Sequence, residues 1–449
     1  MTTLWQASQQ LRAGETDALT LTQQALRAID DAAGEGVRAF TQVYATQAQQ
    51  QAQQASTRWQ QQHARSAIDG LPISIKDLFD VAGETTRAGS RLLEAAPAAT
   101  QDAHVIMRLK QAGAAIVGKT TMTEFAFSGL GINPHYGTPA NPWRREEGRI
   151  PGGSSSGAAV AVADGMCLGA VGTDTGGSVR IPAALCGLTG FKPSASRILQ
   201  HGTLPLATSL DSIGVIAHDV RSCALLDSVI AEQPLKLQGR DLRQARFAVP
   251  QTRVLDGLDT DVRAAWQRAL AILQAQGVRL EALPLPELAE LDTLNARGGI
   301  TAWEAWQWHQ AHVQRAAAQY DPQVLVRIQR GSALSEADAQ QLYAQRAHWR
   351  QRVEQAIAPF DGVLMPTVPM VAPRIAELDD SERYRQVNLL MLRNTSVINM
   401  LDGCAISLPC HQPGSAPVGL MLAAAHGHDA ALLSWAVTLE STLQRSLCS

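Results

Sequence analysis

Short apolar segments alternate with longer amphipathic ones along much of this sequence. The clearest case is a predicted helix, Asp261–Gln276, flanked by two predicted strands, Arg246–Val249 and Val278–Leu280. A β-α-β unit of this kind lays a helix across a sheet, and parallel strands are usually buried on both faces. The pattern therefore predicts a layered α/β protein with a mostly buried β-sheet.

The chain carries no segment that would divide it into separate domains. Its 449 residues allow one large domain or two to three smaller ones, but no linker rich in Pro, Gly and Ser and no internal repeat is evident. Residues 1–70 are predicted to be helical, because alanines in the Gln-rich run recur at steps of three and four. Residues 285–360 are interpreted as a helical, variable insertion in a single domain covering 1–449.

Composition restricts the possible partners. Hydrophobic residues make up 45% of the chain, charged residues 18%, and the net charge is −3, as in globular proteins that do not bind nucleic acid. No stretch approaches the roughly 18 apolar residues of a membrane helix, and no signal peptide is recognisable at the N-terminus, so we expect a cytoplasmic protein without membrane contact. The six cysteines are scattered and predict neither a disulfide framework nor a zinc site.

Two glycine–serine elements, Gly152–Gly157 and Gly172–Arg180, lie close together within apolar sequence. A flexible linker would be polar, and neither element has the spacing of a phosphate-binding loop. Gly153–Gly157 matches the G-x-S-x-G pattern of a hydrolase nucleophile elbow, with Ser155 at its centre, but the preceding residues do not resemble a strand. The phosphate loop and the elbow remain the alternatives to a different serine chemistry.

Ser178 has the local context of a nucleophile. The preceding Gly176-Gly177 pair permits a tight turn in which backbone N–H groups converge on a substrate carbonyl, as in an oxyanion hole. No histidine is singled out as its base, whereas Lys76 follows an apolar strand that could bury it and lower its pKa. From spacing alone, a surface lysine paired with Asp77 is the competing interpretation.

The segment PGGSSSGAAVAVADGMCLGAVGTDTGGSVRIPAALCGLTGFKPS, from Pro151 to Ser194, closely resembles the hallmark stretch of the amidase signature family. Further blocks that resemble this family are Pro72–Gly83, Gly131–Pro142, Ile398–Cys410 and Pro417–Ala425. The resemblance implies a single domain with a mixed sheet surrounded by helices, and a signature core at 71–220 that carries the catalytic residues. It is weak between about residues 231 and 393.

The resemblance also assigns roles to single residues. Ser178 would be the nucleophile, Ser154 a bridging acid and base, and Lys76 the terminal base, with a cis peptide bond between Gly153 and Ser154. The oxyanion would face the N–H groups of Thr175, Gly176, Gly177 and Ser178. Supporting roles fall to Ser155, Asp174 and Arg180, the last two structural rather than chemical.

The implied reaction is hydrolysis of a C–N bond in a small carboxamide, aryl or acyl amide or carbamate through a seryl acyl-enzyme, with no metal or organic cofactor. The glutaminase subunit of a glutamyl-tRNA amidotransferase and a non-catalytic binding relative are the alternative functions. A homodimer is a possible assembly. Tyr136 is the candidate for the substrate pocket, whereas Trp303, Trp306 and Trp308 suit core packing better than an aromatic pocket.

Overall fold

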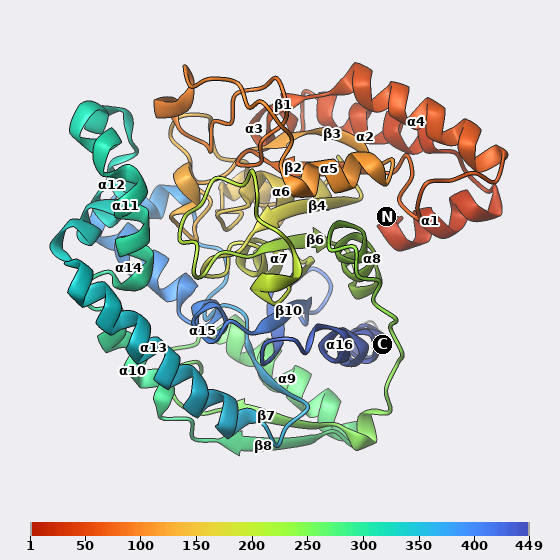
Figure 1. Cartoon of the computed structure of the whole chain (residues 1–449). Coiled ribbons are helices and arrows are strands. Elements are labelled where there is room, and N and C mark those ends of the chain that lie inside the picture. Colours follow the sequence, from red (N-terminus) through yellow and green to blue (C-terminus); the bar gives the residue numbers. More distant parts are fainter. Residues whose placement is uncertain (1, 448–449) are drawn as a thin grey trace.

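One sheet runs through the middle of the molecule (Figure 1). The computed structural model describes residues 2–447, and in this part of the chain eleven strands are ordered β1-β3-β2-β4-β6-β5-β10-β11-β9-β7-β8. The strands are β1 (Phe40–Val43), β2 (Pro72–Lys76), β3 (Ala115–Thr120), β4 (Gly169–Thr173), β5 (Thr189–Lys192), β6 (Ile213–Ala217), β7 (Arg246–Pro250), β8 (Arg279–Leu283), β9 (Gly362–Pro366), β10 (Cys404–Pro409) and β11 (Gly419–Ala424).

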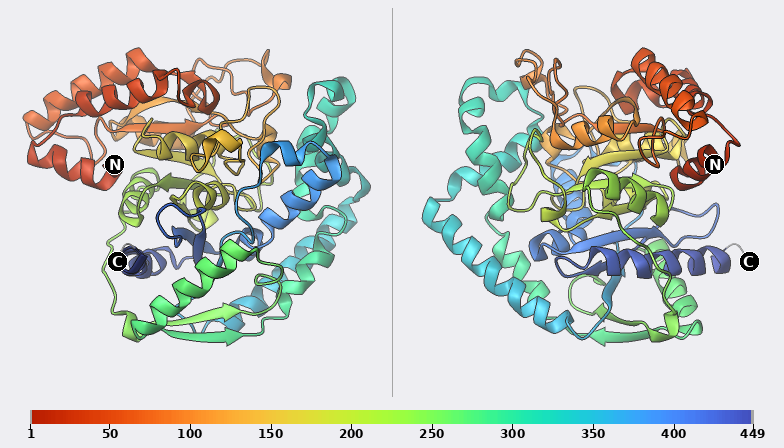
Figure 2. Two further views of the ribbon diagram at one scale, coloured as in Figure 1. Left: turned by 180° about the vertical axis from the view of Figure 1, so that it is seen from behind. Right: turned by 45° about the vertical axis from the view of Figure 1, so that its right-hand side comes forward.

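Helices surround this sheet, as Figures 1 and 2 show. They are α1 (Leu4–Ala13), α2 (Ala18–Asp30), α3 (Gly36–Ala39), α4 (Ala45–Gln60), α5 (His104–Gln111), α6 (Ser156–Ala163), α7 (Arg180–Leu185), α8 (Val220–Ile230), α9 (Thr260–Ala275), α10 (Glu287–Leu294), α11 (Gly299–Ala316), α12 (Pro322–Gln329), α13 (Glu336–Ile357), α14 (Ser381–Leu392), α15 (Thr395–Leu401) and α16 (Asp429–Leu447). The arrangement is the predicted α/β architecture in a single domain.

The sheet is mixed. Strand β2 pairs in parallel with both β3 and β4, and β7 pairs in parallel with β8 and β9, whereas the other pairs are antiparallel. The predicted β-α-β unit is present as β7, α9 and β8. All residues of β2 and β4 are buried, as expected for parallel strands covered on both faces. These two strands position the site described below.

The N-terminal segment departs from the all-helical prediction at one place. Helix α4 forms where the alanine stripe predicts it, and Ala48, Ala52 and Ala55 are buried. Between α3 and α4, however, Phe40–Val43 forms the short strand β1, which pairs antiparallel with β3 at the sheet edge. The residues Phe-Thr-Gln-Val do not alternate between apolar and polar, so the sequence gives no strand signal, and the strand forms through its pairing.

Residues 287–357 hold α10 to α13 with the 3-10 turns η6 (Ala317–Gln319) and η7 (Arg330–Ala333). Helices α11, α12 and α13 form one flank of the molecule, opposite α1 and α16 (Figures 1 and 2). None of the helices in residues 2–447 has the length and apolar character needed to cross a membrane. Five cysteines are buried and free of disulfides, and Cys448 lies outside the described residues.

Candidate active site

Two adjacent parallel strands bring Lys76 and Thr173 together. Lys76 is the last residue of β2 and Thr173 the last residue of β4. Because the strands are parallel and Ile75 pairs with Val171, both ends lie at the same edge of the sheet. The Lys76 Nζ donates a hydrogen bond to Thr173 Oγ1 at 2.9 Å.

Lys76 is completely buried, which excludes a surface lysine paired with Asp77. Its Nζ donates to Ser154 Oγ at 2.7 Å, and no carboxylate in residues 2–447 forms an ion pair with it. Burial disfavours the charged ammonium and lowers the pKa of Lys76 to about 7, although the more distant Asp174 and Asp211 oppose this shift. A large fraction of the amine is therefore neutral near pH 7.

Ser154 lies in an irregular segment directly before α6. The peptide bond between Gly153 and Ser154 is cis, as the resemblance implies. The next residue connects this segment to the second glycine–serine element: Ser155 N–H donates to the Ser178 carbonyl at 3.2 Å, and its Oγ donates to the Thr173 carbonyl at 3.5 Å. No strand precedes Ser155, so the nucleophile-elbow alternative is excluded.

The turn that carries Ser178 is organised around the buried carboxylate of Asp174. This carboxylate accepts the N–H of Gly177 at 2.9 Å and that of Val179 at 3.2 Å, and it pairs with the Arg180 guanidinium at 2.8 Å. Burial would raise the pKa of Asp174, but Arg180, Lys192 and the hydrogen bond from Asn399 together outweigh it and hold the pKa at about 2. Asn399 Nδ2 donates to the same carboxylate at 2.9 Å. Asp174 thus fixes the backbone of the turn in its ionised form.

The backbone donors predicted for the oxyanion hole divide into two kinds. The N–H of Gly177 is directed to Asp174, so it is not available to a substrate. In the described part of the chain, the N–H groups of Thr175, Gly176 and Ser178 have no protein acceptor, and all three residues line a cavity. Two further hydrogen bonds hold this turn: Thr175 Oγ1 donates to Asp211, and Gly176 O accepts from Thr395 Oγ1 at 2.6 Å.

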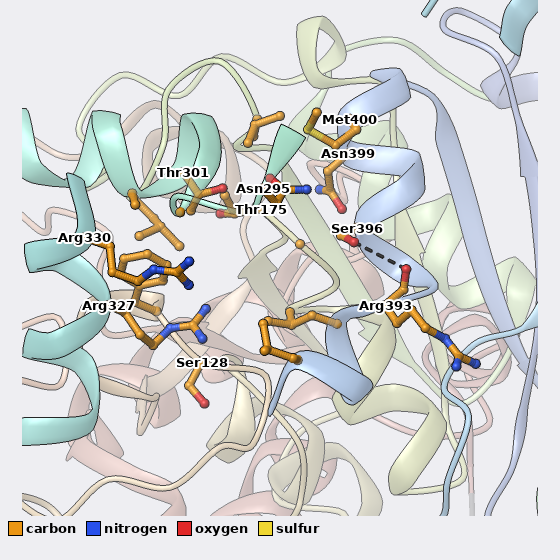
Figure 3. Close-up of a pocket in the computed structure, with 18 of the residues that line it drawn as sticks. Ser128, Thr175, Asn295, Thr301, Arg327, Arg330, Arg393, Ser396, Asn399 and Met400 are labelled. Carbon is orange, nitrogen blue, oxygen red and sulfur yellow. Dashed lines mark hydrogen bonds between the residues drawn. The ribbon is translucent and has the colours of Figure 1, made fainter. Parts of the chain in front are cut away.

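The cavity has a volume of about 630 Å³ and lies between the Ser178 turn and the helices α11 and α12 of the helical flank. Figure 3 shows part of its lining, which comes from the Ser178 turn, the segments around Phe127, Leu206 and Arg253, the end of α10, and α11, α12, η7, α14 and α15. Ser178 is 3% exposed and lines this cavity, whereas Lys76 and Ser154 lie behind it. In residues 2–447 the Ser178 Oγ forms no hydrogen bond.

The aromatic residues singled out in the sequence lie elsewhere. Tyr136 is not part of the cavity wall, and its hydroxyl donates to Glu94 at 2.9 Å, so its assignment to the substrate pocket gains no support from the geometry. Trp306 and Trp308 pack against the main hydrophobic core, and Trp308 stacks on His312 with ring centroids 4.8 Å apart. Trp303 is half-buried outside the cavity wall.

Several residues of the site were not recognised from sequence. Thr173, Thr395 and Asn399 hold the buried lysine or the Ser178 turn, and Arg327 and Arg330 line the cavity. Thr173 and Asn399 carried a signal, because they lie in the Pro151–Ser194 and Ile398–Cys410 blocks. The others have ordinary polar side chains whose position depends on contacts distant in sequence.

Known proteins show the same pattern over most of the chain. The family model described as Amidase matches residues 20–433. The chain belongs to the amidase family. This amidase is 36% identical to the 2-amino-5-chloromuconic acid deaminase of Comamonas testosteroni, over 83% of this chain and 82% of that protein. It is 34% identical to a subunit of the glutamyl-tRNA(Gln) amidotransferase of Roseiflexus castenholzii (strain DSM 13941 / HLO8), over 94% and 91% of the two chains.

A solved amidase crystal structure superimposes on this amidase with a TM-score of 0.89 and 31% sequence identity, covering 98% of this chain and 99% of the other. The predicted fold is thereby confirmed. Family membership also identifies the protein as a hydrolase that acts on carbon–nitrogen bonds, in a family whose members use small amide substrates. Some of its relatives are subunits of larger complexes.

Proposed function

We propose that the protein hydrolyses a C–N amide-type bond of a small molecule through a seryl acyl-enzyme, with Ser178 as nucleophile, Ser154 as bridging acid and base, and Lys76 as terminal base. The observation that carries the proposal is the buried Lys76 amine at 2.7 Å from Ser154 Oγ. A lysine base must be neutral when it acts, and its pKa of about 7 meets this requirement near neutral pH.

In the first half of the reaction, neutral Lys76 accepts the proton of Ser154, and Ser154 accepts the proton of Ser178 as Ser178 Oγ attacks the substrate carbonyl. The second transfer requires the two serine hydroxyls to approach within hydrogen-bond distance when substrate is bound. Catalytic hydrogen bonds are often longer in free enzymes than in their complexes. The Ser155-to-Ser178 backbone contact keeps the two segments adjacent.

The unpaired N–H groups of Thr175, Gly176 and Ser178 are the proposed oxyanion donors. A single such donor contributes roughly 3 kcal/mol to transition-state stabilisation. Gly177 contributes through its conformation, since its N–H is already bonded to Asp174.

Collapse of the tetrahedral intermediate breaks the C–N bond, and Ser154 returns the proton to the departing nitrogen, because an unprotonated amine is a poor leaving group. Water then attacks the acyl-enzyme by the same relay in reverse and releases the acid. All proton transfers in this scheme use side chains of the chain itself.

The relatives suggest two ranges of substrate. The Comamonas testosteroni protein acts, by its name, on an amino-substituted chloromuconic acid, which favours a free-standing enzyme acting on a small molecule. The second candidate is a glutaminase subunit of a glutamyl-tRNA amidotransferase-type complex, favoured by the likeness to the Roseiflexus castenholzii protein over 94% of this chain. Glutaminase assays on the isolated protein and on the protein with any co-purified subunits distinguish the two. A homodimer and a cytoplasmic location remain predictions.

The relay is tested with a small neutral fluorophosphonate probe, which labels an activated serine whatever the natural substrate is. We expect labelling of the wild-type protein and none of Ser178→Ala. Labelling that persists in Ser178→Ala would place the nucleophile elsewhere. No labelling of wild type would favour a non-catalytic relative. A hydrolysis screen of aliphatic amides, anilides, carbamates and urea derivatives then defines the substrate class.

A further inference from the structure

The cavity beside Ser178 is rich in arginine. Arg253, Arg327, Arg330, Arg385 and Arg393 all contribute to its wall, and Asp292 is the sole acidic residue among the described lining residues. Two of these arginines already have carboxylate partners, since Arg253 pairs with Asp292 and Arg385 pairs with Glu382. The other three have none within residues 2–447, so the cavity carries an excess of positive charge.

The three unpaired arginines differ in where they point. In Figure 3 the side chains of Arg327 and Arg330 extend into the cavity from α12 and η7, whereas Arg393 turns away from its centre. Arg393 Nε donates to Asn394 Oδ1 at 3.1 Å, outside the cavity wall. Arg327 and Arg330 are three residues apart on consecutive helical turns, a spacing that places side chains on the same face.

An aromatic ring holds the Arg327 side chain in place, while the donors of its guanidinium stay without acceptors in the described residues. Its guanidinium carbon lies 4.6 Å from the centre of the Phe127 ring, a cation–π contact that orients the group. Its Nε is buried from solvent and has no hydrogen-bond partner in the described residues. Burial lowers the pKa of Arg327 to about 10, which leaves the guanidinium charged at neutral pH.

A half-buried guanidinium that has no carboxylate partner and whose buried Nε–H has no acceptor is costly, because part of its charge and one of its donors are uncompensated. The cost is smaller for Arg330, because this residue is exposed at the side of the cavity and one of its N–H groups donates to Ala296 O at 2.6 Å. A planar anion between the two groups would supply the missing acceptors, and a carboxylate matches the fork of an arginine. The rest of the wall is largely apolar, with Phe127, Leu206, Leu210, Leu389, Leu392 and Met400.

We propose that Arg327 and Arg330 bind a carboxylate of the substrate, so that the amide cleaved at Ser178 belongs to a small molecule that also carries a free carboxylate. The inference rests on the proposed function and narrows its substrate class. An apolar carbon skeleton would contact the leucines and Met400, with the amide at the Ser178 turn and the carboxylate at the arginines. Each arginine is then a specificity-determining residue.

The test measures protection of Ser178 from the fluorophosphonate probe by matched pairs of compounds. Succinamic, glutaramic and adipamic acids place the carboxylate on the acyl side, and N-acetylglycine and N-acetyl-β-alanine place it on the amine side. The neutral partner of each is the compound whose carboxylate is replaced by a carboxamide. We expect at least one acid to halve the labelling rate at a concentration about 10- to 100-fold below its partner, the range of a charge-assisted bidentate contact.

The variants Arg327→Gln and Arg330→Gln show whether these arginines cause the stronger protection by the acids. The advantage of the acid should fall at least tenfold in one or both, while Arg383→Gln, an exposed arginine on α14 outside the cavity wall, should keep it. Arg330 is at the cavity rim, so its variant remains informative if Arg327→Gln fails to fold. The proposal is overturned if no acid protects better than its carboxamide, or if the advantage survives in both variants.

Labelling of Ser178 in the same samples distinguishes a failure of the proposed relay from a failure of the proposed carboxylate site. If wild type is labelled but the acids show no advantage, the relay stands and the carboxylate site is wrong. If wild type is not labelled, the relay fails, and calorimetric titration of the same acids and carboxamides decides on the carboxylate site by the same comparison.

Discussion

Replacing Lys76 by methionine should change both the reactivity of Ser178 and the way in which protein stability depends on pH. The pKa of Lys76 falls from 10.5 to about 7 on folding because the amine is buried. Each pKa unit corresponds to about 1.4 kcal/mol, so the buried lysine costs about 5 kcal/mol of folding free energy at pH values below 7. The unfolded chain binds the proton more tightly, and the cost therefore disappears as the pH rises from 7 to 10.5.

The measurement is the free energy of unfolding in urea at pH 7 and pH 9. Over this interval the wild type should gain about 2 kcal/mol relative to Lys76→Met, because the variant has no amine to deprotonate. Lys192 is also buried, and burial lowers its pKa to about 8, but it is present in both proteins and cancels in the difference. The exposed Lys236 provides the control variant Lys236→Met, which should follow the wild type.

The same pKa predicts the reactivity. The neutral fraction of an amine with a pKa of about 7 rises about tenfold between pH 6 and pH 8, and the fluorophosphonate labelling rate of Ser178 should rise with it. Lys76→Met should label at a small fraction of the wild-type rate at every pH. A labelling rate that is flat or falls between pH 6 and 9, or a stability difference that does not change with pH, would refute the assignment of Lys76 as a buried base.

Three further substitutions test the supporting structure. Gly177→Ala should abolish labelling, because Gly177 has φ +133° and a Cβ there would lie 2.1 Å from Thr395 Oγ1; an unchanged labelling rate would show that the turn is not rigid. Asp174→Ala should lower the free energy of unfolding in urea by roughly 3–5 kcal/mol, because it leaves the Arg180 guanidinium buried without its partner; a loss below about 1 kcal/mol would contradict this. Thr173→Val removes an acceptor of the charged lysine, so the midpoint of the labelling profile should move to lower pH, and a move to higher pH would oppose the proposed role.

The parts of the fold that sequence predicts well are those with a local signal. The β7-α9-β8 unit has clear hydrophobic periods and lies where expected, and the alanine stripe of α4 is buried as predicted. Strand β1 was missed because its four residues are ordered by pairing with β3 rather than by their own pattern. In the site, the paired glycines before Ser178 indicate a tight turn. The hydrogen bond from the Gly177 N–H to the Asp174 carboxylate depends on side-chain packing and cannot be read from the sequence.

The cavity was the least predictable part. Arg327 and Arg330 belong to a helical segment with weak family likeness, where arginines are ordinarily solvent-exposed surface residues. Only the packing of α12 beside Phe127, far away in sequence, makes Arg327 a half-buried residue of the cavity wall. Tyr136 shows the reverse case, since its block resembles the family but its hydroxyl is occupied by Glu94.

The helical flank has a consequence for how proteins of this architecture can diverge. Lys76 and Ser154 are enclosed behind the Ser178 turn at the edge of the sheet, while much of the cavity wall is built from α11, α12 and α14. Substitutions at wall positions such as Thr301 or Gln386 leave every hydrogen bond of the lysine untouched. Under the proposed relay, bond cleavage and substrate selection therefore depend on different parts of the chain, so substitutions on the helices of the cavity wall can change the substrate while the relay stays the same.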